Sequence, residues 1–236
     1  SILPLDSPKD SENTDSADSV FSIVKDSSLD KVVLVEDSFM GFLQAMKVSK
    51  DISKQLVFGV RLDICEDLSS KEENKKKIPT HKVIVFPKNA EGCKLLNSIY
   101  TACKTKHDGL LDLNLLKSMW SKKNLSLAVP FYDSFIYYNI MSFNSWMVDL
   151  SFASPTFFIE SNGLPFDSTI AEAVENYCKA NKFPTEKTQS IYYKNKSDFS
   201  AYVAYKLICS RNSFAGRELS LEKPNIDHLG SDEFCW

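Results

Sequence analysis

Short runs of apolar and β-branched residues recur along this 236-residue chain, and helix-patterned segments separate most of them. Most runs are continuous rather than alternating, which is typical of parallel strands that are covered on both faces. The runs that predict strands are residues 2–5, 31–35, 56–62, 82–86, 125–129, 156–160 and 189–193. Strands that alternate with helices predict an α/β fold with a mostly parallel sheet, either open or closed into a barrel.

The segments between these runs carry apolar residues at helical spacing. In residues 91–103, for example, Leu95, Ile99 and Cys103 share one helix face, with Leu96 beside it. The other predicted helices span residues 110–122, 167–180 and 198–209. Charged or Ser-rich stretches at residues 8–16 and 66–79 predict loops, and both are short for a domain linker. We therefore expect a single domain over residues 1–236, with residues 210–236 as its C-terminal segment.

Charge and composition argue against several classes of protein. The formal net charge is −3, and the only basic tract, residues 75–77, has Glu72 and Glu73 beside it. Because a protein that binds nucleic acid by itself usually has a basic excess, direct DNA binding is not expected. No apolar run approaches the roughly 18 residues that a membrane span needs. The first residues also lack a signal-peptide pattern, so we expect a cytoplasmic protein without a membrane segment.

The reactive residue types show no catalytic signature. The six cysteines form neither a CxxC pair nor a Cys/His cluster with zinc spacing, and we interpret them as reduced core residues. Nucleophile-elbow, P-loop and dinucleotide-binding motifs are also missing from the sequence. Aromatic residues cluster between positions 131 and 146. Most of these are expected in the core, and the remainder as a contact surface.

Several segments follow one another in an informative order. Residues 33–42 read Val-Leu-Val-Glu-Asp-Ser-Phe-Met-Gly-Phe, an apolar strand that ends in a turn with a glycine shortly after it. Residues 56–60 read Leu-Val-Phe-Gly-Val, and residues 83–92 read Val-Ile-Val-Phe-Pro-Lys-Asn-Ala-Glu-Gly. Residues 188–193 read Thr-Gln-Ser-Ile-Tyr-Tyr, and residues 230–234 read Gly-Ser-Asp-Glu-Phe. Together these segments resemble the PHP domain of bacterial-type (C-family) DNA polymerase III alpha subunits.

The resemblance implies a distorted (βα)7 barrel of the PHP type, whose active members hold a metal cluster at the C-terminal mouth for phosphoester hydrolysis. The positions that correspond to the family's ligand motifs are Pro4, Asp6, Asp37, Ser38, Arg61, Ser190 and Tyr192. Ser38 replaces the histidine of the first turn, and Arg61 replaces a glutamate with a cation. Ser190 and Tyr192 replace the late Asp-x-His pair. The metal site is therefore expected to be degenerate.

A non-catalytic, scaffolding role in DNA replication follows from this resemblance. Family members of this kind pack against the polymerase core, and some carry the proofreading exonuclease subunit, so these are the expected partners and no cofactor is expected. The alternative is a residual metal-dependent phosphoesterase or 3′–5′ exonuclease, with Mn or Zn held by Asp6, Asp37 and Glu160. In the resemblance to the family, Pro4 and Asp6 occupy the histidine positions of the first His-x-His motif. A third alternative is a regulatory protein that uses the fold only as a surface.

Four further interpretations concern individual titratable residues. Asp37 follows a predicted strand, where it could cap the next helix. Alternatively, Arg61 could form a buried ion pair with Asp37 or Asp6 and fill the metal site with a fixed positive charge. Glu160 and Asp198 could remain as an acid pair, although the sequence gives no reason to place them together. His81, which precedes a predicted strand, is interpreted as a structural or surface histidine.

Overall fold

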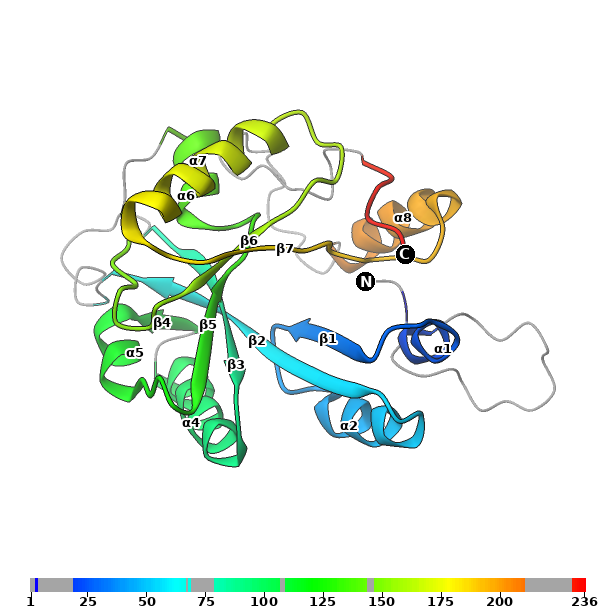
Figure 1. Cartoon of the computed structure of the whole chain (residues 1–236), viewed down its shortest axis with the longest axis horizontal. Coiled ribbons are helices and arrows are strands. Elements are labelled where there is room, and N and C mark those ends of the chain that lie inside the picture. Colours follow the sequence, from blue (N-terminus) through cyan, green and yellow to red (C-terminus); the bar gives the residue numbers. More distant parts are fainter. Residues whose placement is uncertain are drawn as a thin grey trace.

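The computed structural model describes residues 3, 19–66, 68, 79–106, 109–143, 147–210 and 231–236. The helices and strands alternate along much of the chain (Figure 1). In order they are α1 (Val20–Asp26), β1 (Lys31–Glu36), α2 (Phe42–Asp51), β2 (Gln55–Cys65), β3 (His81–Pro87), α4 (Ala90–Lys106), β4 (Leu110–Asp112), α5 (Leu113–Met119), β5 (Leu125–Val129), α6 (Phe135–Met141), β6 (Thr156–Ile159), α7 (Asp167–Asn181), β7 (Thr185–Lys187), the 3-10 helix η1 (Lys196–Asp198) and α8 (Phe199–Ser210).

The strands form one curled sheet in the order β1-β2-β3-β5-β6-β7, and β4 pairs with the last residues of β2 beyond the end of β1. Every pairing is parallel except those of β3, which runs antiparallel to both β2 and β5. The sheet curls as a half-barrel, and no pairing joins β1 to β7 among the described residues (Figure 1). An α/β fold with mostly parallel strands is thus confirmed, whereas a complete (βα)7 barrel is not.

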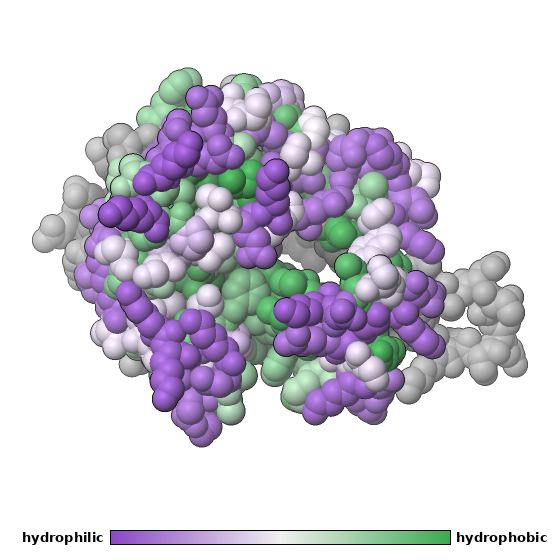
Figure 2. Space-filling view, in the orientation of Figure 1, coloured by the Kyte–Doolittle hydropathy of each residue, from purple (hydrophilic) through white to green (hydrophobic). Residues whose placement is uncertain are grey.

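Helices cover the outer side of this curled sheet. α2, α4 and α5 pack against β2, β3 and β4, while α7 packs against β6 (Figure 1). The side chains of β2 alternate, so that Phe58, Val60 and Leu62 are buried toward the helices while Arg61 is half-buried on the other side. Figure 2 shows apolar residues in the middle of the sheet and a hollow between β1 and β7. Polar residues on the inner side of the half-barrel are therefore partly accessible.

Most strand predictions are confirmed, because apolar runs mark buried strands well. The runs at 31–35, 56–62, 82–86, 125–129 and 156–160 all form strands. The prediction at 189–193 is wrong: the strand is β7, which is polar and exposed along its length, and Tyr193 makes a single isolated bridge with Cys235. Leu3 lies in a bend, and the rest of the predicted strand at 2–5 lies outside the described residues.

The helix predictions at 91–103, 167–180 and 198–209 are confirmed as α4, α7 and α8. The prediction at 110–122 begins too early, because residues 110–112 pair with β2 as β4. Asp112 then caps α5 by accepting hydrogen bonds from the amides of Asn114 and Leu115. The periodicity did not predict α1 and α6, which have 7 residues each, or α2. The loop at 8–16, most of 66–79 and residues 211–230 lie outside the described residues.

The cysteines and aromatic residues mostly follow the core interpretation. Cys65, Cys103 and Cys178 are buried free thiols, but Cys93 is exposed, so the core interpretation is wrong for that residue. Most of the described aromatic residues between 131 and 143 are buried, whereas the Phe143 side chain is 94% exposed. Within the described part of the chain, no helix combines the length and the apolarity needed to cross a membrane.

Candidate functional site

The carboxyl ends of the parallel strands meet at one edge of the sheet, and β3 begins at that edge because it runs the opposite way. In parallel α/β folds, functional side chains gather at this edge. Here it carries an unusual number of polar side chains. We call it the carboxyl edge and define it by Asp37, Arg61, Asp63, Lys82, Tyr132, Asp133, Glu160, Asn162, Asp167 and Ser190.

Asp37 and Arg61 form a two-point ion pair at the β1–β2 end of the carboxyl edge. Arg61 Nε donates to Asp37 Oδ1 over 2.7 Å, and Arg61 Nη2 donates to Asp37 Oδ2 over 3.3 Å. Burial alone would raise the pKa of Asp37, but the hydrogen bond and charge of Arg61 outweigh it and hold that pKa below its usual value. The predicted ion pair is confirmed. It is not buried, however, since 31% of the Arg61 side chain and 67% of the Asp37 side chain are exposed.

Asp37 does not cap the helix that follows it. α2 begins at Phe42, and its N-cap position is Gly41, which has a left-handed φ of 81° and no side chain that could cap the helix. Ser38 Oγ instead accepts a hydrogen bond from the amide of Met40 within the turn. The capping interpretation is therefore wrong, because the turn extends the chain beyond the reach expected of an N-cap side chain.

A second charged group lies at the β2–β3 junction. Asp63 is the register partner of Lys82 on β3, and Lys82 Nζ lies 3.6 Å from Asp133 Oδ2. The Tyr138 hydroxyl also donates to Asp133 over 3.0 Å. Burial raises the pKa of the Asp63 carboxyl, and the negative charges of Asp37 and Asp133 add to that effect against the opposing Lys82. Three carboxyl groups thus lie beside two cations along this half of the edge.

The β5–β7 half of the carboxyl edge holds its polar groups by buried hydrogen bonds. Glu160 is 7% exposed, and Asn162 is 1% exposed. Glu160 Oε2 accepts from Asn162 Nδ2 over 2.9 Å and from the amide of Ser190 over 3.0 Å. Its other oxygen accepts from the Ser190 hydroxyl over 2.9 Å. Both carboxylate oxygens of Glu160 are therefore already occupied by donors of this chain.

Asp167 has an equivalent place in the same network. Its Oδ1 accepts from the Tyr132 hydroxyl over 2.8 Å, and its Oδ2 accepts from the amides of Asn162 over 2.8 Å and Leu164 over 3.1 Å. Asn162 Nδ2 also donates to the Tyr132 hydroxyl over 3.2 Å. Burial raises the pKa of Tyr132 far above its usual value, so this phenol stays protonated. The network is a fixed framework of donors and acceptors.

The residues present at the carboxyl edge do not fit a bound metal ion. Divalent metals take ionised carboxylates, imidazoles or thiolates as ligands. Asp37 is paired with an arginine, and the oxygens of Glu160 accept hydrogen bonds from Ser190 and Asn162. In the part of the chain that the structure describes, no group of three or more His, Cys, Asp or Glu side chains is arranged to hold a metal.

The predicted site residues that the structure describes lie at separate places in the fold. Pro4 and Asp6 lie outside the described residues. Asp37 and Glu160 follow strands that β2, β3 and β5 separate in the sheet order, and each has partners of its own. Glu160 and Asp198 have separate partners: Asp198 accepts from the amide of Asn195 at the start of η1, and Glu160 accepts from the amide of Ser190.

The sequence patterns did not identify several polar residues of the carboxyl edge as site residues: Asp63, Lys82, Tyr132, Asn162 and Asp167. Asp63 carried a usable signal, since it lies two residues after Arg61 on a strand and so shares its face. Asn162 lies in a polar stretch directly after a strand, which marks the correct edge but not its partners, whereas the apolar residues 164–166 separate Asp167 from that stretch. His81 is 3% exposed and packs against Phe135, as expected for a structural histidine.

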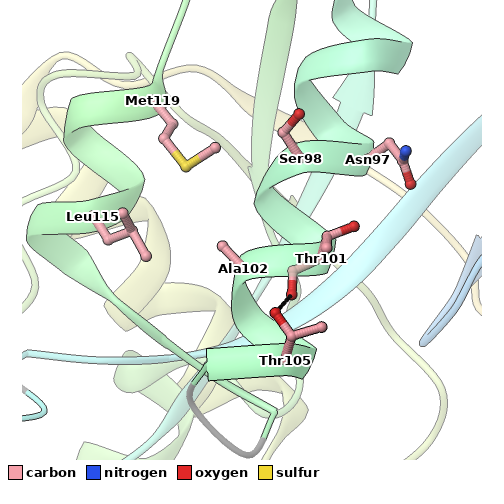
Figure 3. A pocket seen from close by; sticks show the side chains of 7 residues that line it. All are labelled: Asn97, Ser98, Thr101, Ala102, Thr105, Leu115 and Met119. Atoms are coloured by element: carbon pink, nitrogen blue, oxygen red, sulfur yellow. Dashed lines mark hydrogen bonds between the residues drawn. The ribbon is translucent and has the colours of Figure 1, made fainter.

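A separate groove of about 450 Å³ lies between α4 and α5 (Figure 3). Its walls carry hydroxyl, amide and apolar side chains: Asn97, Ser98, Thr101, Ala102, Thr105, Leu115 and Met119. Thr105 Oγ1 donates back to the Thr101 carbonyl over 2.7 Å within the helix. The groove therefore lacks any carboxylate, imidazole or thiol, and the carboxyl edge remains the candidate site.

Comparison of the sequence with protein-family models and with curated proteins gives no match.

Proposed function

We propose that this chain is a non-catalytic PHP-like domain of a C-family DNA polymerase alpha subunit and that it acts as a scaffold in DNA replication. The curled, mostly parallel sheet with helices on its outer side is compatible with a distorted (βα)7 barrel. The observation that carries the proposal is the 2.7 Å contact between Arg61 and Asp37. It holds a permanent positive charge where the resemblance expects a metal-binding glutamate.

Ser190 and Tyr192, at the late ligand motif, also have structural partners. Ser190 donates to Glu160 through both its amide and its hydroxyl. The Tyr192 ring stacks on Tyr202 at 5.3 Å and on Phe234 at 5.2 Å, so it serves packing. Ser190 and Tyr192 thus have structural roles in place of metal ligation, which supports the non-catalytic part of the proposal. The proposed task of the domain is to bind the polymerase core and, in some assemblies, a proofreading exonuclease subunit.

Metal content and nuclease activity test the non-catalytic part of this proposal. We expect the purified chain to retain no stoichiometric Mn or Zn, and to leave single-stranded DNA and phosphoester substrates intact when manganese is added. Asp37→Ala is the informative variant, with Asp51→Ala, an exposed carboxylate on α2, as its control. Stoichiometric metal together with nuclease activity that Asp37→Ala abolishes and Asp51→Ala retains would establish the residual-nuclease alternative instead.

Partner binding tests the scaffolding part. The chain should bind a C-family polymerase core, or the proofreading exonuclease subunit, in a co-purification or calorimetric assay with purified components. Because the proposed role needs the surface but not the ion pair, Arg61→Ala should bind as well as the wild type. Lack of binding to both components would favour the regulatory alternative, in which only the fold is shared.

A further inference from the structure

The last described segment, residues 231–236, lies against the chain that follows β7 (Figure 1, in red). The amide of Tyr192 donates to the Phe234 carbonyl over 2.9 Å, and the amide of Trp236 donates to the Tyr193 carbonyl over 3.1 Å. The Gln189 side chain also donates to the Cys235 carbonyl over 3.1 Å. We call residues 231–236 the strap. It binds through its backbone, much as an added strand binds to a sheet edge.

One aromatic side chain anchors the strap to the carboxyl edge. Phe234 is 4% exposed, and its ring lies 5.2 Å from that of Tyr192 and 6.1 Å from that of Tyr132. Tyr132 is the phenol that donates to Asp167 and accepts from Asn162. The anchor of the strap therefore packs directly on a member of the buried polar network.

The loop after β6 is shaped to receive the strap. The Ser231 hydroxyl donates to the Asn162 carbonyl, and the Tyr193 hydroxyl donates to the Ser231 carbonyl over 3.1 Å. Gly163 has a φ of +72°, and a Cβ at this position would lie 3.3 Å from Glu233 Cγ. The glycine thus meets two needs at once, a left-handed turn and close approach of the strap.

The outer rim of the strap is weakly held. Lys196 contacts Glu233 and lies 4.0 Å from Asp232, and all of these side chains are about half exposed. Exposed ion pairs contribute little and are screened by salt. Apart from Phe234, the strap has no fully buried large side chain, so it is expected to open at a lower free energy than the central strands of the sheet.

We propose that the strap is a cover on the carboxyl edge, and that its release opens the Glu160–Asn162–Ser190 network, in which Glu160 and Asn162 are buried, to water. The contacts of Ser231 with Asn162 and of Phe234 with Tyr132 couple the two events. A partner that draws the strap away therefore also loosens the network. The strap would act in this way whether or not the chain has the proposed function, because all of its contacts are with other residues of this chain.

Residue-resolved amide hydrogen exchange on the full chain tests the proposal. Phe234→Ala should speed exchange at the amides of Tyr192, Trp236 and Ser190 by about 100-fold, because it removes the apolar anchor. The exchange rates of amides in the β2–β3 ladder should change by less than about threefold. Phe143→Ala, which truncates an exposed ring, is the matched control and should change none of these rates. If Phe234→Ala does not fold, Ser231→Ala should speed exchange at the same amides by about 10-fold.

Three results would overturn the proposal. In the first, the amide of Trp236 exchanges in the wild type as fast as in an unstructured peptide, so the strap is not docked. In the second, Phe234→Ala speeds exchange at Tyr192 and Trp236 but not at Ser190, so the strap does not control the network. In the third, the β2–β3 amides accelerate equally, so the strap opens only when the whole domain unfolds.

Discussion

The two halves of the carboxyl edge hold polar side chains in different ways. At the β1–β3 half, Asp37 and Arg61 form a half-exposed ion pair, and Lys82 reaches Asp133 in a similar environment. At the β5–β7 half, Glu160 and Asp167 are less than 10% exposed and are held by neutral donors of the chain. The β1–β3 half therefore relies on ion pairs that solvent can screen, and the β5–β7 half relies on hydrogen bonds that are largely shielded from solvent.

The two halves are therefore expected to respond differently to substitution. A surface ion pair contributes about 0–1 kcal/mol, because solvent screens it and both side chains lose freedom. A buried donor that loses its acceptor costs about 1–3 kcal/mol, since no water replaces the lost bond. The same edge of one sheet should thus contain both tolerant and intolerant positions. Three measurements test this contrast.

The largest effect is expected at Asp167. Asp167→Ala leaves the Tyr132 hydroxyl and the amides of Asn162 and Leu164 without their acceptor. We expect a loss of about 4 kcal/mol in the free energy of unfolding, measured by urea titration. Asp51→Ala, which removes an exposed carboxylate, should change it by less than about 0.5 kcal/mol. Equal effects of the two variants would contradict the contrast.

An intermediate effect is expected from pH, through His81 at the start of β3. Burial lowers the pKa of His81 from 6.5 to about 4. The unfolded chain therefore takes up this proton near pH 6.5, whereas the folded chain does not until about pH 4, so stability falls as the pH drops through this window. Between about pH 7 and about pH 4.5, the wild type should lose about 2 kcal/mol more than His81→Leu.

The pH measurement also separates His81 from the ion pair. The pKa of Asp37 is lowered from 3.8, so its contribution is present above that value and is lost only as the pH falls through the lowered folded pKa. Parallel pH profiles for the wild type and His81→Leu would show that water reaches His81 in the folded state.

The smallest effect is expected for the ion pair itself. A double-mutant cycle of Asp37→Ala and Arg61→Ala should give a coupling energy of about 0.5 kcal/mol, because both side chains are partly exposed. The coupling should fall further in about 1 M NaCl. A salt-independent coupling above about 2 kcal/mol would instead place the pair in a dry environment, like the β5–β7 half.

The sequence predicted the exposed half of the site better than the buried half. The pair of Arg61 and Asp37 followed from their places near the ends of neighbouring apolar runs. The partners of Glu160 did not, because Ser190 is 30 residues away and its amide has no signature in a sequence. Asp167 appeared only as the first residue of a predicted helix, although its carboxylate turns back to the loop before it.

Local pattern alone determined most of the strands and the buried face of α7, whereas in α8 Tyr202 is buried and Tyr205 is exposed. In α4, Ile99 and Cys103 are fully buried as their helical spacing predicts, but it is Leu96 that is buried with them, while Leu95 is only partly buried. Contacts between distant segments, in contrast, make β3 antiparallel, place the polar residues of β7 at the edge of the sheet, and bring residues 231–236 back against the chain that follows β7. These outcomes depend on pairings between distant segments, whose free energy comes from the partner surface and is not contained in the composition of either segment alone.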